Sequence, residues 1–257
     1  MGEMHHLDVG CADASVILSD GACFLIDCHG IEQYAGLLPS SRNLRGVFIT
    51  HQHYDHFDGL RYLRDQRFTI EHLIYSPYDR RHDDGSVDYE EWREFESLRD
   101  HFAGKGTKLH SPYRQGAFKE PFWKTNGVEF WIIGPDRTIA SRETRELHDA
   151  CLVIHVKAGG SSRRCLYTGD ASDSELEFVA NNTNNYCNDI LRGSHHGSLN
   201  GAHLDFIKKA NAQYSVISTA SGVHENVPHP TALQRYRDNT KKKVYRTDQD
   251  GSIKWQI

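Results

Sequence analysis

The stretch Phe48–Leu60, "FITHQHYDHFDGL", places three histidines and two aspartates within eight residues, directly after the apolar run "GVFIT". That run has the length and β-branched character of a short buried strand. Imidazole nitrogens and carboxylate oxygens are metal ligands, and residues on a turn can aim His51 and His53 one way while Asp55 and His56 aim another. The stretch therefore predicts part of a two-metal site at the end of a strand, in preference to a solvated loop.

Three later segments offer further donors next to predicted strands. His148 precedes "CLVIHV", Asp170 ends "CLYTGD", and His195 and His196 end "DILRGSHH". Donors at the ends of successive strands meet at one edge of a sheet, where a carboxylate can bridge two divalent ions and imidazoles fill the remaining positions. For the adjacent histidines two readings stay open: both function at the site, or one functions and the other packs.

The remaining chain predicts a layered fold of sheets and helices. Eleven short apolar runs predict strands, and Asp20–Gly21 between two of them is a strong hairpin signal. Helical patterns lie between the later runs, and in the segment 89–106 four apolar residues share one face before a glycine stop. Alternating strands and helices indicate an α/β or α+β fold. The charged and aromatic stretch 76–122 predicts a helical excursion that covers a site. The apolar runs are SVILSD, ACFLID, GVFIT, HLIY, VEFWII, CLVIHV, RCLYTGD, DILRGS, YSVIST, KVYR and SIKWQI. The helical segments are GLRYLRDQ, YEEWREFESLRDHFAGKG, HLDFIKKA and HPTALQRYRDN.

Composition is that of an ordinary globular chain. The 257 residues are 38% hydrophobic and 25% charged, and we expect them to form one domain. No apolar run approaches the roughly 20 residues of a membrane span, and the N-terminus has no secretion signal, so a cytoplasmic protein is expected. A net charge of −5 argues against broad adhesion to nucleic acid but leaves a phosphate substrate open. The six cysteines lack CxxC spacing and are expected to be reduced thiols.

The residues His51, His53, Asp55 and His56 match the HxHxDH signature of the metallo-β-lactamase superfamily. Seven further segments follow the order of the metallohydrolase domain of ComEC-type DNA-uptake proteins, and the chain resembles that domain over nearly its whole length. The resemblance implies a four-layer αββα sandwich, with two mixed sheets flanked by helices and a dinuclear site along one edge. These segments are LDVGCADASVIL, FLIDCHG, WIIGP, LYTGD, SHHGS, HPTAL and TDQDGSI.

The same resemblance implies a role for each donor. His51 and His53 would bind the first metal, Asp55 and His56 the second, and Asp170 would bridge them. His196 is preferred over His195 as the last ligand of the second metal, which leaves the other histidine near the substrate phosphate. His148 either supplies the third histidine of the first metal or lies just outside it. The ions would be two divalent metals, zinc or manganese.

Several residues are expected to support these donors or to meet the substrate. Asp27, at the end of "FLID", is expected to support the metal loop by hydrogen bonding. Asp13 lies in "GCADA", which keeps the aspartate of the related turn but not its glutamine or second glycine. His229, between two prolines, either contacts phosphate and protonates the leaving group or merely stiffens the start of a helix. Ser198 and Asn200 are further candidates for substrate contact.

The predicted activity is metal-dependent hydrolysis of a phosphodiester, in DNA, RNA or a nucleotide, with Asp55, Asp170 and His229 as catalytic residues. The first alternative is a hydrolase of the same fold that acts on a thioester, lactam, lactone or phosphorylcholine ester, because function depends on the site and its loops. The second is a binding module that keeps metal for stability without turnover. The complete set of donors argues against the second alternative.

Overall fold

Two seven-stranded mixed sheets pack face to face in the computed structural model, which describes residues 2–81, 84–116, 120–158 and 163–257. The strands of the first sheet, in spatial order, are β16 (Ile253–Gln256), β1 (Glu3–His6), β2 (Ala14–Ser19), β3 (Ala22–Cys28), β5 (Gly46–Ile49), β7 (His72–Tyr75) and β8 (Lys108–His110). Those of the second are β15 (Lys243–Arg246), β14 (Tyr214–Ile217), β13 (Ile190–Arg192), β12 (Arg163–Tyr167), β11 (Val153–Ala158), β10 (Val128–Gly134) and β9 (Trp123–Thr125). A small sheet pairs β4 (Asn43–Leu44) with β6 (Thr69–Ile70).

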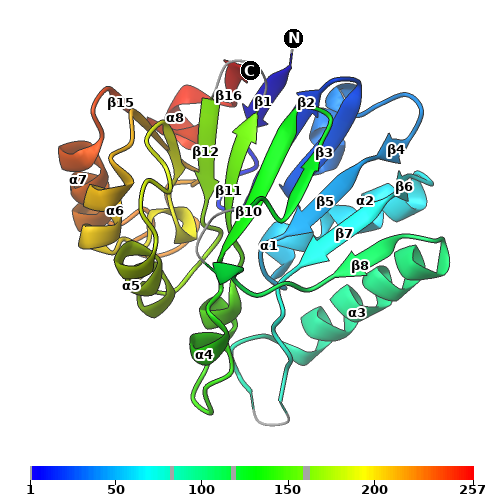
Figure 1. Ribbon diagram of the computed structural model, residues 1–257, viewed down its shortest axis with the longest axis horizontal. Helices are drawn as coiled ribbons and strands as arrows, with labels where there is room; N and C mark the ends of the chain where they lie inside the picture. The colour runs from blue at the N-terminus through cyan, green and yellow to red at the C-terminus, as the bar shows by residue number, and fades with distance from the viewer. Residues whose placement is uncertain (1, 82–83, 117–119, 159–162) are drawn as a thin grey trace.

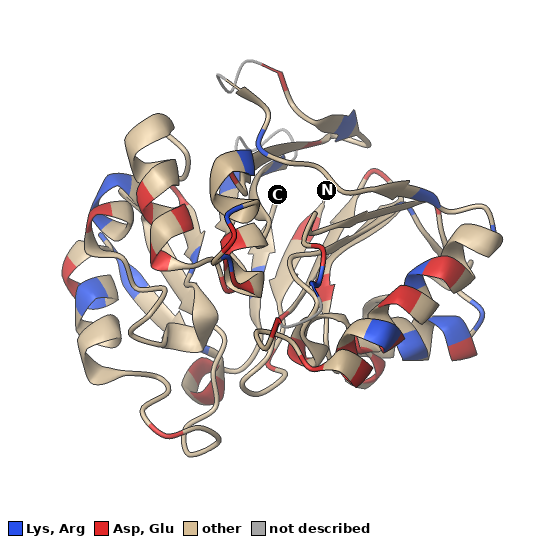
Figure 2. Cartoon of the chain, turned by 90° about the horizontal axis from the view of Figure 1, so that it is seen from below, with Lys and Arg blue, Asp and Glu red and all other residues tan. Residues whose placement is uncertain are grey.

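Helices cover the outer face of each sheet (Figure 1). The first sheet is covered by η1 (Ile31–Leu37), α1 (Tyr54–Phe57), α2 (Gly59–Asp65) and α3 (Tyr89–Gly104). The second is covered by α5 (Asp173–Asn182), α6 (Leu204–Ala210) and α7 (Pro230–Asn239). Short helices in the connections are α4 (Arg137–Ala140), η3 (Leu147–Ala150), η4 (His195–Gly197) and α8 (Thr247–Asp250). Charged residues of both signs are spread over the outer helices (Figure 2).

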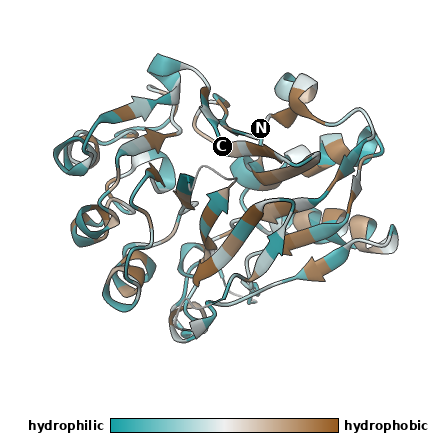
Figure 3. Cartoon of the chain, turned by 45° about the horizontal axis from the view of Figure 1, so that its top comes forward, coloured by the Kyte–Doolittle hydropathy of each residue, from teal (hydrophilic) through white to brown (hydrophobic). Residues whose placement is uncertain are grey.

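An apolar layer fills the space between the two sheets. Its side chains come from alternate positions of strands in both sheets, and Phe48 of β5 stacks on Phe130 of β10 with ring centroids 4.6 Å apart. Trp123 of β9 stacks on Phe130 as well, at 5.7 Å. Apolar colour concentrates on the strands in Figure 3, as a sandwich with two buried sheet faces requires.

The predicted layered fold is confirmed, and its local signals are confirmed as well. Each of the eleven apolar runs overlaps a strand, and the Asp20–Gly21 turn joins β2 to β3 with Ser19 opposite Ala22. Four predicted helices correspond to α2, α3, α6 and α7, and the four apolar residues on one face of α3 are buried. All six cysteines are free.

The stretch 76–122 is helical only in part. It contains α3, but the chain then returns as β8, which pairs in parallel with β7 and forms the edge of the first sheet. The end of this stretch, 117–119, lies outside the described residues. No helix of the described chain has the length and hydropathy to cross a membrane.

Candidate metal centre

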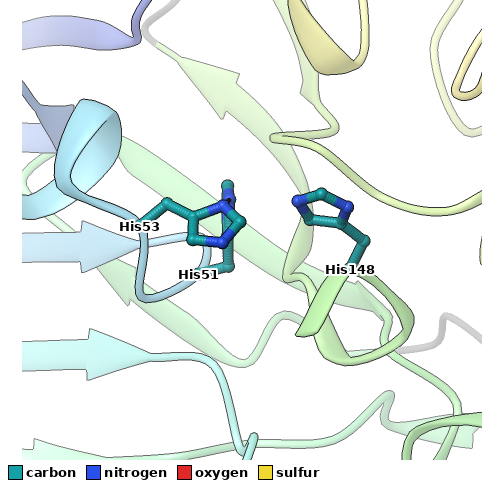
Figure 4. Close-up of side chains that lie close together, drawn as sticks. All are labelled: His51, His53 and His148. Atoms are coloured by element: carbon teal, nitrogen blue, oxygen red, sulfur yellow. Dashed lines mark hydrogen bonds between the residues drawn. The ribbon is translucent and has the colours of Figure 1, made fainter. Parts of the chain in front are cut away.

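Three histidines form the first group of metal-type donors. His51 and His53 follow β5, and His148 lies on η3, across from them (Figure 4). Each offers one nitrogen, and these atoms lie within 4.8 Å of one another. His51 Nε2 is 3.1 Å from His53 Nδ1. The two sheets therefore contribute to one cluster, because β5 belongs to the first and η3 leads into β11 of the second.

A second group joins two carboxylates and two imidazoles. Asp55, His56, Asp170 and His196 each offer one atom within 4.8 Å of the others. His196 Nε2 lies 3.2 Å from Asp55 Oδ2, and His56 Nε2 lies 3.3 Å from Asp170 Oδ1. Asp170 Oδ2 is also 3.8 Å from His51 Nε2 of the first group. Asp170 therefore stands between the two groups.

Topology explains why these donors converge. Asp170 and the His195–His196 pair follow the carboxyl ends of β12 and β13, which run parallel to each other. β11 is antiparallel to β12, so its amino end, where His148 lies, is at the same edge. The donors after β5 reach this edge from the facing sheet. The sequence prediction that strand ends would meet at one edge is thus confirmed.

The side chains of the adjacent histidines of "SHHGS" point to different parts of the site. Both have left-handed backbone angles, φ 50° for His195 and 52° for His196, so the chain turns sharply between their side chains. His196 is buried in the second group. His195 is 25% exposed, and its Nε2 lies 3.7 Å from Asp170 Oδ2 on the side of His148. Asn200 accepts a hydrogen bond from His195 Nδ1 at 3.1 Å, which orients that ring.

Three of the histidines donate their outward N–H to a fixed acceptor. An N–H committed to a carbonyl or carboxylate leaves the lone pair of the other ring nitrogen facing inward, as metal binding requires. The bonds are His53 Nε2 to the Ser86 carbonyl (3.0 Å), His56 Nδ1 to Asp27 Oδ2 (2.9 Å) and His196 Nδ1 to the Ser218 carbonyl (3.2 Å).

Unsatisfied polar atoms collect at the same place. His56 Nε2, His148 Nε2 and Asp170 Oδ1 are buried and form no hydrogen bond among the described residues, although His56 Nε2 and Asp170 Oδ1 lie 3.3 Å apart. Each such atom costs about 1–3 kcal/mol when nothing binds it. Imidazole nitrogens with bridging carboxylate oxygens are the donors that zinc and similar divalent ions take in proteins. The residues therefore fit metal ions.

The two groups differ electrostatically. Burial lowers the pKa of His148 to about 3, and burial followed by the neighbouring His56 lowers that of His51, so both rings are neutral with lone pairs available. Burial also acts on His196, but Asp170 and Asp55 outweigh it and raise its pKa to about 9. A cation that binds at the second group must displace that proton.

The predicted supporting aspartates lie behind the donors. Asp27 is buried and accepts from Thr50 N at 2.7 Å and Thr50 Oγ1 at 2.8 Å, besides its bond to His56. Asp13 holds the loop that carries Asp55. Its backbone N–H donates to the Asp55 carbonyl at 2.9 Å, and its carboxylate pairs with buried Arg192. Both aspartates thus fix the backbone or rings of donor residues.

His229 begins α7. Its side-chain Nδ1 accepts from Thr231 N at 3.1 Å. Its backbone N–H donates to the Gly197 carbonyl at 2.8 Å, which ties the residue to the "SHHGS" turn. His229 therefore caps the start of α7, as one of the two interpretations of this residue predicted. Ser198 lies on the same turn, where its N–H donates to the His195 carbonyl at 2.7 Å.

Two supporting residues carry no sequence motif. Ser86 bonds to His53 through its carbonyl and accepts from Leu147 N through its hydroxyl at 2.9 Å, so it links both sides of the first group. Glu91 of α3 accepts from Tyr54 N at the start of α1. Both belong to the stretch 76–122, where only tertiary packing reveals their partners.

Comparison with known proteins places this architecture in a family. The sequence pattern of the metallo-beta-lactamase superfamily matches residues 8–220. ComE operon protein 3 of Bacillus subtilis (strain 168) is 27% identical over 128 residues, which are 50% of this chain and only 16% of that protein.

Solved structures agree in fold. The metallo-beta-lactamase fold protein YhfI from Bacillus subtilis superposes with a TM-score of 0.60 at 15% identity, covering 99% of each chain. The short form of human tRNase Z gives 0.55 at 16%, covering 99% of this chain and 100% of that one. The match over most of the sequence, together with the paired donor groups at the sandwich edge, shows that the chain belongs to the metallo-β-lactamase superfamily of metal-dependent hydrolases.

Proposed function

We propose that this protein hydrolyses phosphodiester bonds with two divalent ions, zinc or manganese. The observation that carries the proposal is the pair of donor groups on either side of Asp170. The first group would comprise His51, His53 and His148, and the second Asp55, His56 and His196. Divalent ions held by these residues would supply a water nucleophile at neutral pH and neutralise charge on the phosphate.

The protein's own residues have distinct tasks in this reaction. Asp170 and Asp55 hold negative charge between and beside the imidazoles, and their fixed positions orient the attacking water. His195, oriented by Asn200 and partly exposed, is placed to contact a phosphate oxygen. His229 would protonate the leaving alkoxide through Nε2, because Nδ1 is engaged by the helix. Ser198 would contact the same phosphate.

Several observations support a phosphoester in preference to a lactam or thioester. The solved structures of similar fold include a tRNase Z. The site also presents a partly exposed imidazole, His195, beside the donors, where it can contact an anion. Imidazole-rich donors suit zinc, whereas the carboxylates of the second group tolerate manganese.

The test compares substrates and one substitution. Bound metal is measured first, then turnover of bis-p-nitrophenyl phosphate, labelled single-stranded DNA, a lactam and a thioester. We expect phosphodiester cleavage by the wild type and almost none by Asp170→Asn, because the shared carboxylate is lost. Asp205→Asn, an exposed aspartate on α6, is the matched control and should keep full activity. Lactam or thioester cleavage without phosphodiester turnover would refute the proposal.

A further inference from the structure

Two hollows adjoin beside the metal centre. The first, of about 740 Å³, is lined by His148 and Ser86 of the site and extends to Arg81. The second, of about 560 Å³, begins at Arg81 and continues over the outer face of α3. Because Arg81 lines both, the two hollows adjoin at this residue, and together they form a groove that has His148 of the first donor group at one end.

The first hollow alone is large enough for a small substrate. Pockets of about 300–1,000 Å³ hold a ligand of drug or nucleotide size. A single phosphodiester with its flanking groups therefore fits beside His148 without reaching α3. The second hollow would then serve a part of the substrate that lies beyond the reacting phosphate.

The second hollow has a different lining from the first. In the first hollow, the arginines stand beside three acidic residues, which are Asp84, Glu143 and Glu146. The second is lined by Arg80, Arg81 and Arg93 and by a single carboxylate, Glu96, which pairs with Arg93 at 3.0 Å. The groove thus becomes more basic with distance from the donors, in a chain whose net charge is −5.

An exposed aromatic ring stands among these arginines. Tyr89 at the start of α3 is 54% exposed, and the Arg80 guanidinium lies 5.4 Å from its ring centroid. Trp92, which also lines the hollow, is 9% exposed and packs against the ring of Tyr78. The buried Trp92 therefore serves as a floor, and Tyr89 is the ring available to a ligand.

Arginines interleaved with an exposed aromatic ring are typical of surfaces that bind single-stranded nucleic acid. The guanidinium groups neutralise backbone phosphates, and a base stacks on the ring irrespective of sequence. We propose that this groove, formed by Arg80, Arg81, Tyr89 and Arg93, binds the strand of a single-stranded polynucleotide next to the phosphate held at the metals. The inference rests on the proposed function, and it specifies the substrate as a strand of several nucleotides.

The experiment compares a long and a short substrate. Arg80→Gln/Arg93→Gln and Tyr89→Ala are assayed with 12-nucleotide single-stranded DNA and RNA, and with bis-p-nitrophenyl phosphate, which reaches only the metals. We expect kcat/KM for at least one oligonucleotide to fall about tenfold or more in both variants, with bis-p-nitrophenyl phosphate turnover unchanged. The salt dependence of oligonucleotide binding should weaken by about one ion per arginine removed. The DNA and RNA arms identify which strand is the substrate.

Arg237→Gln, an exposed arginine on α7 in the opposite helical layer, is the matched control. Equal oligonucleotide kinetics in the groove variants and the wild type would overturn the inference, as would an equal loss with both kinds of substrate. If the wild type cleaves no phosphodiester, the proposed function fails. Fluorescence anisotropy with the same oligonucleotides then still tests whether the groove binds a strand. In that case the inference requires that the wild type binds a strand and the groove variants bind it more weakly.

Discussion

At the scale of single residues, neighbours in the sequence have different surroundings. His195 and His196 share a residue type and a left-handed backbone, yet one is partly exposed beside Asn200 and the other is buried against Asp55. The sequence predicted that donors cluster here but could not decide between these two histidines, because the direction of each ring depends on a turn of a few residues. The structure places His196 among Asp55, His56 and Asp170, and its preference as a ligand, which came from the family resemblance, stays a prediction.

The first prediction separates a ligand from a substrate contact. In the proposed two-ion site, His148→Ala should lower the bound metal towards one ion, because it removes one of the three histidines of the first donor group. His195→Ala should keep both ions and lower phosphodiester turnover. Its KM should rise while its metal affinity stays unchanged. Metal content by atomic spectroscopy and steady-state kinetics give both quantities. Loss of an ion in His195→Ala, with none lost in His148→Ala, would reverse the assignment.

At the scale of elements, the strongest periodic signals were predicted correctly and the weak ones were missed. β2 and α3 carry clear apolar patterns, whereas β1 reads "EMHH" and β8 reads "KLH". β1 becomes a strand because β16 and β2 pair on either side of it, and β8 because β7 offers an open edge. Such pairing joins residues far apart in the chain, so no local pattern announces it.

The loop before α3 should control the first donor group. Ser86→Ala removes the hydroxyl that accepts from Leu147 N but keeps the carbonyl bonded to His53, so η3 and its His148 lose an anchor. We expect metal affinity at the first group to fall about 10-fold, at the lower end of what supporting residues contribute, with little change at the second. Competition with a chelator measures both affinities. Ser97→Ala, on the exposed face of α3, is the control, and equal affinities in the two variants would exclude this role.

The contact between α5 and β10 should make stability depend on pH. Glu175 of α5 is buried, and burial raises the pKa of its carboxyl to about 8, although it accepts from Asp136 N at 3.0 Å. The folded protein therefore holds this proton between about pH 4.5 and 8, where the unfolded chain has lost it. Stability contributed by the protonated group is full below that window and declines as pH rises through it.

Glu175→Gln tests this pH dependence. The amide stays neutral and still offers an oxygen to Asp136 N, so the variant should gain stability over the wild type at pH 8.5 and not at pH 4.5. Chemical denaturation across this range measures the difference. Glu177→Gln, exposed on the same helix, should follow the wild type. A constant difference at all pH values would show that Glu175 is not protonated in the fold.

At the scale of the whole molecule, the site depends on how the two sheets sit against each other. Donors from the first sheet follow β5, and donors from the second precede β11 or follow β12 and β13. Because each group takes residues from both sheets, any sliding of the sheets would pull each group apart. The resemblance to a known family supplied this arrangement in advance. What it could not supply is the buried ion pair that joins the sheets, because the aspartate and the arginine lie far apart in the chain and belong to no shared motif.

That pair, Asp13 and Arg192, joins the first sheet to the end of β13, with Arg192 only 2% exposed. Removing one partner leaves a buried charge unpaired, which costs about 3–5 kcal/mol, whereas replacing both costs less than the sum. Asp13→Asn and Arg192→Met should therefore each destabilise strongly, and the double variant should recover part of the loss. Lys243→Met, which breaks an exposed pair with Asp250, should change stability far less, because solvent screens an exposed ion pair.

The same cycle should also report on the metals. Asp13 holds the Asp55 peptide, and Arg192 ends the strand that leads to His196, so both belong to the backbone of the second donor group. Each single variant should then bind its second ion more weakly at a temperature where it is still folded. Denaturant unfolding and metal titration on the four proteins of the cycle measure the two effects together. Additive losses of stability with unchanged metal binding would mean that the sheets are aligned by their apolar interface alone, without help from this pair.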